Sequence, residues 1–272
     1  MRATLRALPT MMRVGFAEAI AYRAETVVWM LTNTMPLVNL ALWSAVARGG
    51  TPDGTIGRYG SPDLVAYFLA ALVVRQLTGS WVLWEMSQDI RKGQLSMRLL
   101  RPVHPIVAYA TENLSALPLR AGFALPVAAV GVAVAGADHV TRDPQIVLLA
   151  CVALLGAWLI NFFSMILMGA LGFFIEQSYS VFELWLGAFF VMSGYFFPLD
   201  FIAERAPTVF AVAKALPFYV INGFPVELLL GKHDVASALR HLGVQWAWVA
   251  AFVVSALALW NAGMKRYNAY GA

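Results

Sequence analysis

The chain has 272 residues, 60% of them hydrophobic and only 12% charged, with a formal net charge of +4. So few charged groups cannot cover a soluble globule of this length, and the composition therefore predicts an integral membrane protein. The positive charge does not indicate nucleic acid, because lysine and arginine beside membrane spans are usual in such chains. The single cysteine, Cys151 in an apolar run, excludes an internal disulfide framework.

Residues 1–25 predict an amphipathic helix that lies on the membrane surface. At about 100° per residue, one helical face collects apolar side chains and another collects basic ones. The apolar face consists of Leu5, Leu8, Met12 and Phe16, and the basic face of Arg2, Arg6 and Arg13. This pattern is typical of an interfacial helix. A signal peptide is not expected, because the long apolar run starts only near residue 26 and lacks a small-residue cleavage site.

Residues 26–272 predict one all-α membrane domain with six spans. A bilayer crossing needs about 20 mostly apolar residues. The stretches that meet or approach this length are 26–46, 64–84, 106–136, 145–175, 183–198 and 242–264. The fourth exceeds what an upright helix needs, which indicates a tilted or projecting helix. The fifth is short.

The distribution of basic residues predicts the orientation. Ten lysines and arginines lie in the N-terminal segment, the 85–102 loop and the C-terminal tail, against seven in the loops on the other side. Because basic residues concentrate on the cytosolic side, we expect both termini and the 85–102 loop in the cytosol.

The segment between the fifth and sixth spans, residues 198–240, is expected to be extracytosolic. It is half apolar and contains Pro207, Pro217 and Pro225. Two short helices that dip into the outer leaflet, broken at residues 216–217 and 224–225, would keep its irregular backbone shielded. The alternative is an amphipathic loop lying on the outer surface.

Charged residues inside the spans are candidate functional groups, because burying them in a membrane is costly. Arg75 lies near the centre of the second span and should face the bundle interior, paired with Glu112 or Glu176. It would either line a substrate path or form a structural ion pair. Glu112 and Arg120 lie near the cytosolic end of the third span, where long side chains reaching the membrane surface are the simpler interpretation.

Catalytic and nucleotide-binding motifs are missing from the sequence. There is no phosphate-binding GxxxxGK[ST] loop, since Lys232 is followed by His233. The four histidines are scattered and do not show metal-ligand spacing, and no serine nucleophile motif occurs. We therefore expect no catalysis, no metal and no bound cofactor in this chain.

The 85–102 loop combines features of a docking segment. Asp89 can cap a helix start, and Arg91 and Lys92 offer charge-assisted contacts to an acidic partner. Gly93 permits a turn, and Leu95 with Leu99 would offer an apolar contact. For two further basic residues of the loop, anchoring to lipid headgroups is the favoured interpretation, and these are Arg98 and Arg101.

The order of these parts resembles the type-2 permease family of ABC exporters. The likeness rests on the interfacial helix, the six spans and two sequence elements. The elements are the loop Glu85…Ile90-Arg91-Lys92-Gly93-Gln94-Leu95…Leu99-Leu100-Arg101-Pro102 and, after the fifth span, Ser193-Gly194-Tyr195-Phe196-Phe197-Pro198.

The resemblance implies a permease subunit of the bacterial cytoplasmic membrane that couples to a separate ABC ATPase. Two ATPase copies would bind ATP and Mg, and a second permease subunit, identical or related, would complete the path. Coupling would involve Glu85, Asp89, Ile90, Arg91, Lys92, Gly93 and Leu95. The outer gate would involve Gly194, Tyr195, Phe196, Phe197, Pro198 and Pro217.

Two alternatives belong to other functional classes. A secondary transporter would use Arg75 and Glu112 as coupling groups, but inverted repeats and paired broken helices are not recognisable in the sequence. A membrane-embedded enzyme would need a catalytic constellation that the sequence does not show.

Overall fold

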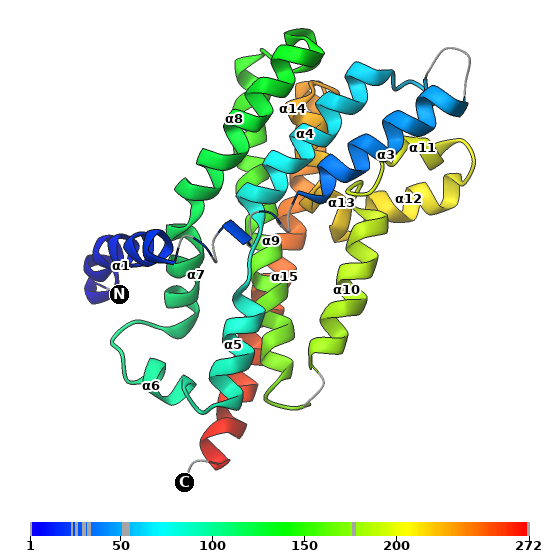
Figure 1. The fold of residues 1–272 in the computed structure, drawn as a ribbon. Helices are drawn as coiled ribbons and strands as arrows, with labels where there is room; N and C mark the ends of the chain where they lie inside the picture. Colours follow the sequence, from blue (N-terminus) through cyan, green and yellow to red (C-terminus); the bar gives the residue numbers. More distant parts are fainter. Residues whose placement is uncertain are drawn as a thin grey trace.

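The computed structural model describes residues 2–22, 24, 27, 28, 31, 34–50, 55–175 and 178–270, and this part of the chain is almost entirely helical (Figure 1). Within it, extended pairing is limited to one isolated antiparallel bridge between Ile56 and Tyr59. The all-helical architecture agrees with the fold class expected from composition.

Four stretches are long and apolar enough to cross a membrane: Ser61–Arg91, Pro105–Ala133, Pro144–Leu171 and Val235–Tyr267. They confirm the second, third, fourth and sixth predicted spans, and the chain is an integral membrane protein. At the fifth predicted span lies a shorter apolar helix, α10 (Ser178–Met192). For the first predicted span, much of residues 26–33 lies outside the described residues, and helix α3 (Met35–Gly50) follows. These two spans remain predictions.

Two of the four spans are interrupted, which the sequence analysis did not predict. The first of them consists of α4 (Ser61–Thr78) and α5 (Val82–Arg91), separated by residues 79–81. The second consists of α7 (Pro105–Ser115) and α8 (Leu117–Ala135), separated at Ala116. Glycine and proline explain both breaks: Gly79 has extended backbone at the first, and Pro118 lies in the opening turn of α8 at the second.

Helix α9 (Pro144–Leu171) occupies the centre of the bundle, with α15 (Val235–Tyr270) packed along it (Figure 1). Small residues of α9 permit this close approach, since a Cβ at Gly156 would lie 2.7 Å from the Gln245 side chain. The buried Gln245 amide donates to Ala153 O at 2.9 Å and to Val220 O at 2.7 Å. One side chain thereby joins α15, α9 and the segment that precedes α15.

That preceding segment forms four short helices: α11 (Asp200–Ala203), α12 (Pro207–Ala215), α13 (Pro217–Ile221) and α14 (Gly223–Leu229). The predicted break before Pro217 is confirmed. The second break lies at Asn222, and the prediction at residues 224–225 is wrong because Pro225 sits in the first turn of α14, where its missing N–H is tolerated.

Helices α13 and α14 are buried against α9, and α14 also contacts α4. They pack into the bundle, which contradicts a loop lying on the surface for this part. Their placement as a re-entrant element in the outer leaflet stays a prediction.

Helix α1 (Arg2–Ala21) forms where the sequence predicts a helix and lies crosswise to the bundle, against α7 (Figure 1). Its contact with α7 is tight at Gly15, where a Cβ would lie 2.4 Å from the Ser115 hydroxyl oxygen. Met12 and Phe16 of the predicted apolar face are exposed on the protein surface. This exposure is compatible with lipid contact, and the interfacial location stays a prediction.

Candidate functional site: the 85–102 loop and the cavity beneath α1

The charged loop folds as the end of α5, a tight turn and helix α6 (Leu95–Leu99). Gly93 supplies the turn with φ +71°, a left-handed conformation that favours glycine. The capping role suggested for Asp89 is wrong, because this residue lies in the last turn of α5 and accepts from side chains instead. The turn brings α6 back beside α5.

A cluster of charges around Arg98 holds this arrangement. The Arg98 guanidinium contacts three carboxylates: Asp89 through Nε at 2.6 Å, Glu112 through Nη1 at 2.9 Å and Glu85 through Nη2 at 3.1 Å. Tyr109 donates its hydroxyl to Asp89 Oδ2 at 2.7 Å, and the guanidinium lies 4.4 Å from the centre of the Tyr109 ring. We call these five residues the Arg98 cluster. It joins α5, α6 and α7.

This cluster corrects two predictions. Arg98 is 15% exposed and bound to protein carboxylates, so anchoring to lipid headgroups is wrong for it. Glu112 pairs with Arg98, so its predicted pairing with Arg75 is wrong as well. Both predictions fail for the same reason. Three carboxylates converge on Arg98, so Arg98 binds them and not lipid headgroups, and Glu112 binds Arg98 and not Arg75. Arg101 is exposed, and its lipid contact stays a prediction.

The loop residues proposed for docking differ in their accessibility. Leu95 is fully buried and Asp89 is 6% exposed, whereas Ile90 is half-buried. Arg91, Lys92, Gly93 and Glu85 are exposed. Two apolar side chains that were not among the predicted docking residues are strongly exposed, Met97 at 66% and Leu100 at 80%.

The exposed side chains of the loop therefore lie on α5, in the Gly93 turn, on α6 and directly after it. Helix α6 is also tied to α15, since the hydroxyl oxygens of Ser96 and Tyr267 lie 2.9 Å apart.

Arg75 packs against aromatic rings. Its guanidinium lies 5.3 Å from the centre of the Phe189 ring and 6.0 Å from that of Tyr195. Such cation–π contacts offset part of the cost of placing a guanidinium inside a bundle. The other partner predicted for it, Glu176, lies outside the described residues.

Arg120 is buried, and the prediction that it reaches the membrane surface is wrong. It is 6% exposed and donates to two backbone carbonyls, Gly79 O at 2.6 Å and Asn113 O at 2.5 Å. Both acceptors lie next to the helix breaks, where carbonyls lack their usual helical partners. Arg120 is therefore buried because it binds backbone carbonyls at the two helix breaks.

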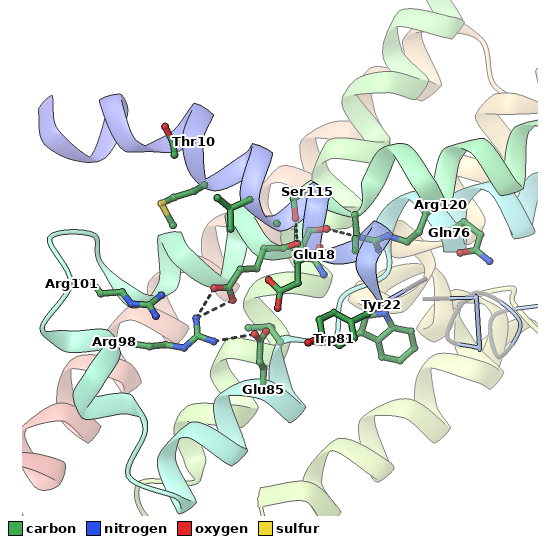
Figure 2. A pocket seen from close by; sticks show the side chains of 18 residues that line it. Thr10, Glu18, Tyr22, Gln76, Trp81, Glu85, Arg98, Arg101, Ser115 and Arg120 are labelled. Atoms are coloured by element: carbon green, nitrogen blue, oxygen red, sulfur yellow. Dashed lines mark hydrogen bonds and ion pairs between the residues drawn. The ribbon is translucent and has the colours of Figure 1, made fainter. Parts of the chain in front are cut away.

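A cavity of about 690 Å³ lies between α1 and the two interrupted spans. Figure 2 shows Glu18 and Glu85 reaching into it from α1 and α5, with Arg120 on the side of α8. Two of the charged residues predicted for a substrate path line it, Glu112 and Arg120. Its apolar lining includes Met11, Val14, Trp81 and Val82. Its volume falls in the range of ligand-binding pockets.

Three of the residues predicted for an outer gate accept hydrogen bonds from side chains through their backbone carbonyls. Tyr67 donates to Gly194 O at 2.7 Å, Asn39 to Tyr195 O at 3.1 Å and Trp43 to Phe196 O at 2.7 Å. The last two of the gate segment, Phe197 and Pro198, are half-buried and buried. Pro217 begins α13 and is buried, and α13 packs against α9. The gate segment thus contacts both α3 and α4.

Sequence reasoning missed Glu227 in α14, which lies outside the four spans. This 6% exposed carboxylate contacts Lys214 at 3.1 Å and His233 at 3.0 Å, and it accepts from Tyr219 at 2.6 Å. Burial alone would raise the pKa of Glu227, but these partners outweigh it and lower the pKa to about 2. The available signal was one carboxylate in an otherwise uncharged run from residue 216 to 230.

In the described part of the chain, no group of three or more His, Cys, Asp or Glu side chains is arranged to hold a metal ion. In a comparison with protein families, the family described as ABC-2 family transporter protein matches residues 34–271. No curated protein matches the chain. The family match covers every described helix except α1.

Proposed function

Because the chain belongs to the ABC-2 family of transporter proteins and is a membrane component of an ABC transporter, we propose that it is the permease of an exporter driven by a separate ATPase. Family membership supports a permease over the two alternatives, a secondary transporter and a membrane-embedded enzyme. Two ATPase copies would bind ATP and Mg, since this chain carries no phosphate-binding loop. A second permease subunit, identical or related, would complete the complex.

The observation that carries this proposal is the surface of α6. Met97 in α6 and Leu100 directly after it expose apolar side chains, and Arg91 and Lys92 before the Gly93 turn are exposed as well, while buried Leu95 and the Arg98 cluster hold α6 to the bundle. Exposed apolar and basic side chains on one short loop that is braced from inside suit docking of a partner with an acidic, partly apolar groove. We assign the ATPase contact to this surface. Glu85 and Asp89 would contribute indirectly, because they bind Arg98 and thereby hold α6 in place.

The orientation follows from the same assignment. The ATPase acts in the cytosol, so the 85–102 loop and both termini would lie there, in the cytoplasmic membrane of a bacterium. The segment 198–240 and the gate residues around Tyr195 would then face outward.

The cavity beneath α1 is the best-supported place for substrate contact within one subunit. It brings together Glu112 and Arg120 with apolar side chains from α1 and α5. Apolar walls with a few fixed charges suit an amphiphilic molecule.

The experiment is co-purification with a P-loop ATPase, to be sought first in the reading frames adjacent to this gene. Met97→Asp and Leu100→Asp should reduce the recovered ATPase at least tenfold while membrane insertion stays unchanged. Val209→Asp, at an exposed valine of α12, is the matched control and should retain the ATPase. Equal recovery with all three variants would refute the docking assignment. Failure of the unaltered chain to bind the ATPase would refute the proposed function itself.

A further inference from the structure

The two interrupted spans break at about the same height in the bundle (Figure 1). In the α4–α5 span, Gly79 adopts extended backbone with φ −62° and ψ 143°, and residues 79–81 lie outside both helices. In the α7–α8 span, Ala116 separates the two helices. Breaks of this kind leave carbonyls without helical partners, which is costly inside a membrane unless protein groups bind them.

Arg120 binds a carbonyl at each break. Its Nη1 donates to Gly79 O at 2.6 Å in one span, and its Nη2 donates to Asn113 O at 2.5 Å in the other. A guanidinium can do this because its donors point in different directions in one plane. A lysine ammonium is a single point and does not reproduce that geometry. One side chain therefore joins the two breaks directly.

Two residues of α9 support the same region. Asn161 donates to Thr78 O at 3.1 Å, and Trp158 donates through Nε1 to the side-chain oxygen of Asn113 at 2.8 Å. Thr78 and Asn161 are nearly inaccessible, at 2% and 3% exposed. The breaks are thus ordered sites held by side chains, and they are positioned against the central helix.

The segments beyond the breaks already form one unit at their other end. The Arg98 cluster connects α5, α6 and α7 through four close contacts to Asp89, Glu85, Glu112 and Tyr109. On the α1 side, the cavity borders both breaks, since its lining includes Trp81, Asn113, Ala116 and Arg120. The cavity therefore provides open space beside the two breaks, into which α5, α6 and α7 can tilt together.

We propose that Arg120 is a positioning residue that makes the two breaks bend together, so that α5, α6 and α7 move as one body relative to α4 and α8. Two sets of contacts produce this coupling. The Arg98 cluster joins α5, α6 and α7 at the loop, and Arg120 of α8 binds a carbonyl at each break. The use of this motion in transport rests on the proposed function, because the ATPase would push on α6. The joint itself, meaning the two helix breaks linked by Arg120, needs only this chain.

The test measures distances between spin labels on the purified chain in lipid nanodiscs, without any ATPase. The background variant is Cys151→Ser, because Cys151 is exposed. Two pairs cross the joint at exposed positions: Ser61 with Gln88 across α4–α5, and Pro102 with Leu125 across α7–α8. Two pairs do not cross it: Gln88 with Pro102, which both lie between the two breaks, and Ser61 with Val130, on α4 and α8.

In Arg120→Gln, both distance distributions that cross the joint should become about twofold broader, and both other distributions should keep their widths. Arg240→Gln, at an exposed arginine of α15, should change none of the four. If Arg120→Gln does not insert into the membrane, Arg120→Lys carries the test with the same criterion. Unchanged crossing pairs, broadening of only one of them, or broadening of all four pairs would overturn the proposal.

Adding the ATPase and ATP separates this inference from the proposed function. The unaltered chain should then shift both crossing distances together. If the ATPase does not bind but the four label pairs behave as stated, the proposed function fails and the joint stands. If the ATPase binds and the label pairs do not behave as stated, the joint fails and the proposed function stands.

Discussion

Arg98 and Asp89 form an ion pair with 2.6 Å between Nε and Oδ2, and this pair closes the Gly93 turn from the inside. Asp89 is bound a second time by the Tyr109 hydroxyl. The loop proposed to meet the ATPase is therefore braced mainly by Arg98, Asp89 and Tyr109, which are buried or half-buried. Its rigidity depends on one arginine and its three carboxylates, a dependence that variants can measure.

Replacing Arg98 by alanine should destabilise the protein. The change leaves Asp89, Glu85 and Glu112 without their shared cation, and removing one partner of a largely buried ion pair costs about 3 kcal/mol. Thermal unfolding in detergent should show a clear loss relative to Arg91→Ala, the exposed arginine of the same loop. Equal unfolding temperatures for the two variants would contradict a bracing role.

Changing the Gly93 turn should impair ATPase binding with little effect on membrane insertion. Gly93→Pro forces φ to about −65°, whereas the turn requires +71°, so α6 can no longer fold back beside α5. We expect the same loss from reversing the charges of Arg91 and Lys92 to glutamate. ATPase recovered by affinity purification measures the effect, and undiminished recovery with both variants would count against this loop as the contact.

Gly15 should control how α1 seats on α7. Its Cβ position lies 2.4 Å from Ser115 Oγ, so Gly15→Val should push α1 away and open the cavity. A cysteine at the half-buried Met11, in a Cys151→Ser background, should then react several-fold faster with a maleimide. Gly122→Val is the control, because a Cβ there meets no atom within 4 Å. Identical reaction rates in both variants would exclude this role for Gly15.

Gly194 should be intolerant of any side chain. Its φ of +80° is left-handed, and a Cβ would lie 2.6 Å from the Tyr67 hydroxyl that donates to its own carbonyl. Gly194→Ala should cost about 2 kcal/mol or more in the free energy of unfolding. The matched control is Gly187→Ala in α10, where a Cβ meets open space and alanine should stabilise the helix by up to ~1 kcal/mol. Thermal unfolding of the two variants should shift in opposite directions.

The sequence predicted the positions of four spans well, because length and apolarity are local properties of the chain. It did not predict where two of these spans break. Gly79 and Pro118 are visible in the sequence, but a break inside a bundle also needs a partner for the freed carbonyl. For Gly79 that partner is Arg120, 41 residues away, and such a contact exists only in the folded chain.

Charge pairing was harder to predict than charge burial. The sequence identifies Arg75, Arg120 and Glu112 as intramembrane charges, but it does not rank the groups that compete for them. Glu112 pairs with Arg98, 14 residues earlier, whereas Arg75 packs against aromatic rings and Arg120 binds backbone carbonyls. The geometry of the turns decides these outcomes.

The Glu227 site should make stability depend on pH in the acidic range. Its folded-state pKa of about 2 lies below the ordinary value of 4.5, so its contribution is fully present above about pH 4.5 and is lost as pH falls toward 2. The difference corresponds to roughly 3 kcal/mol at neutral pH. Glu227→Gln should lose this contribution, because Lys214 and His233 then face a neutral amide, and it should flatten the fall of unfolding temperature between pH 4.5 and 2.

Glu183→Gln, at an exposed glutamate of α10, should leave the acidic fall unchanged. If the Glu227→Gln and unaltered proteins lose stability in parallel across that range, the bonds from Lys214, Tyr219 and His233 do not stabilise the ionised carboxylate.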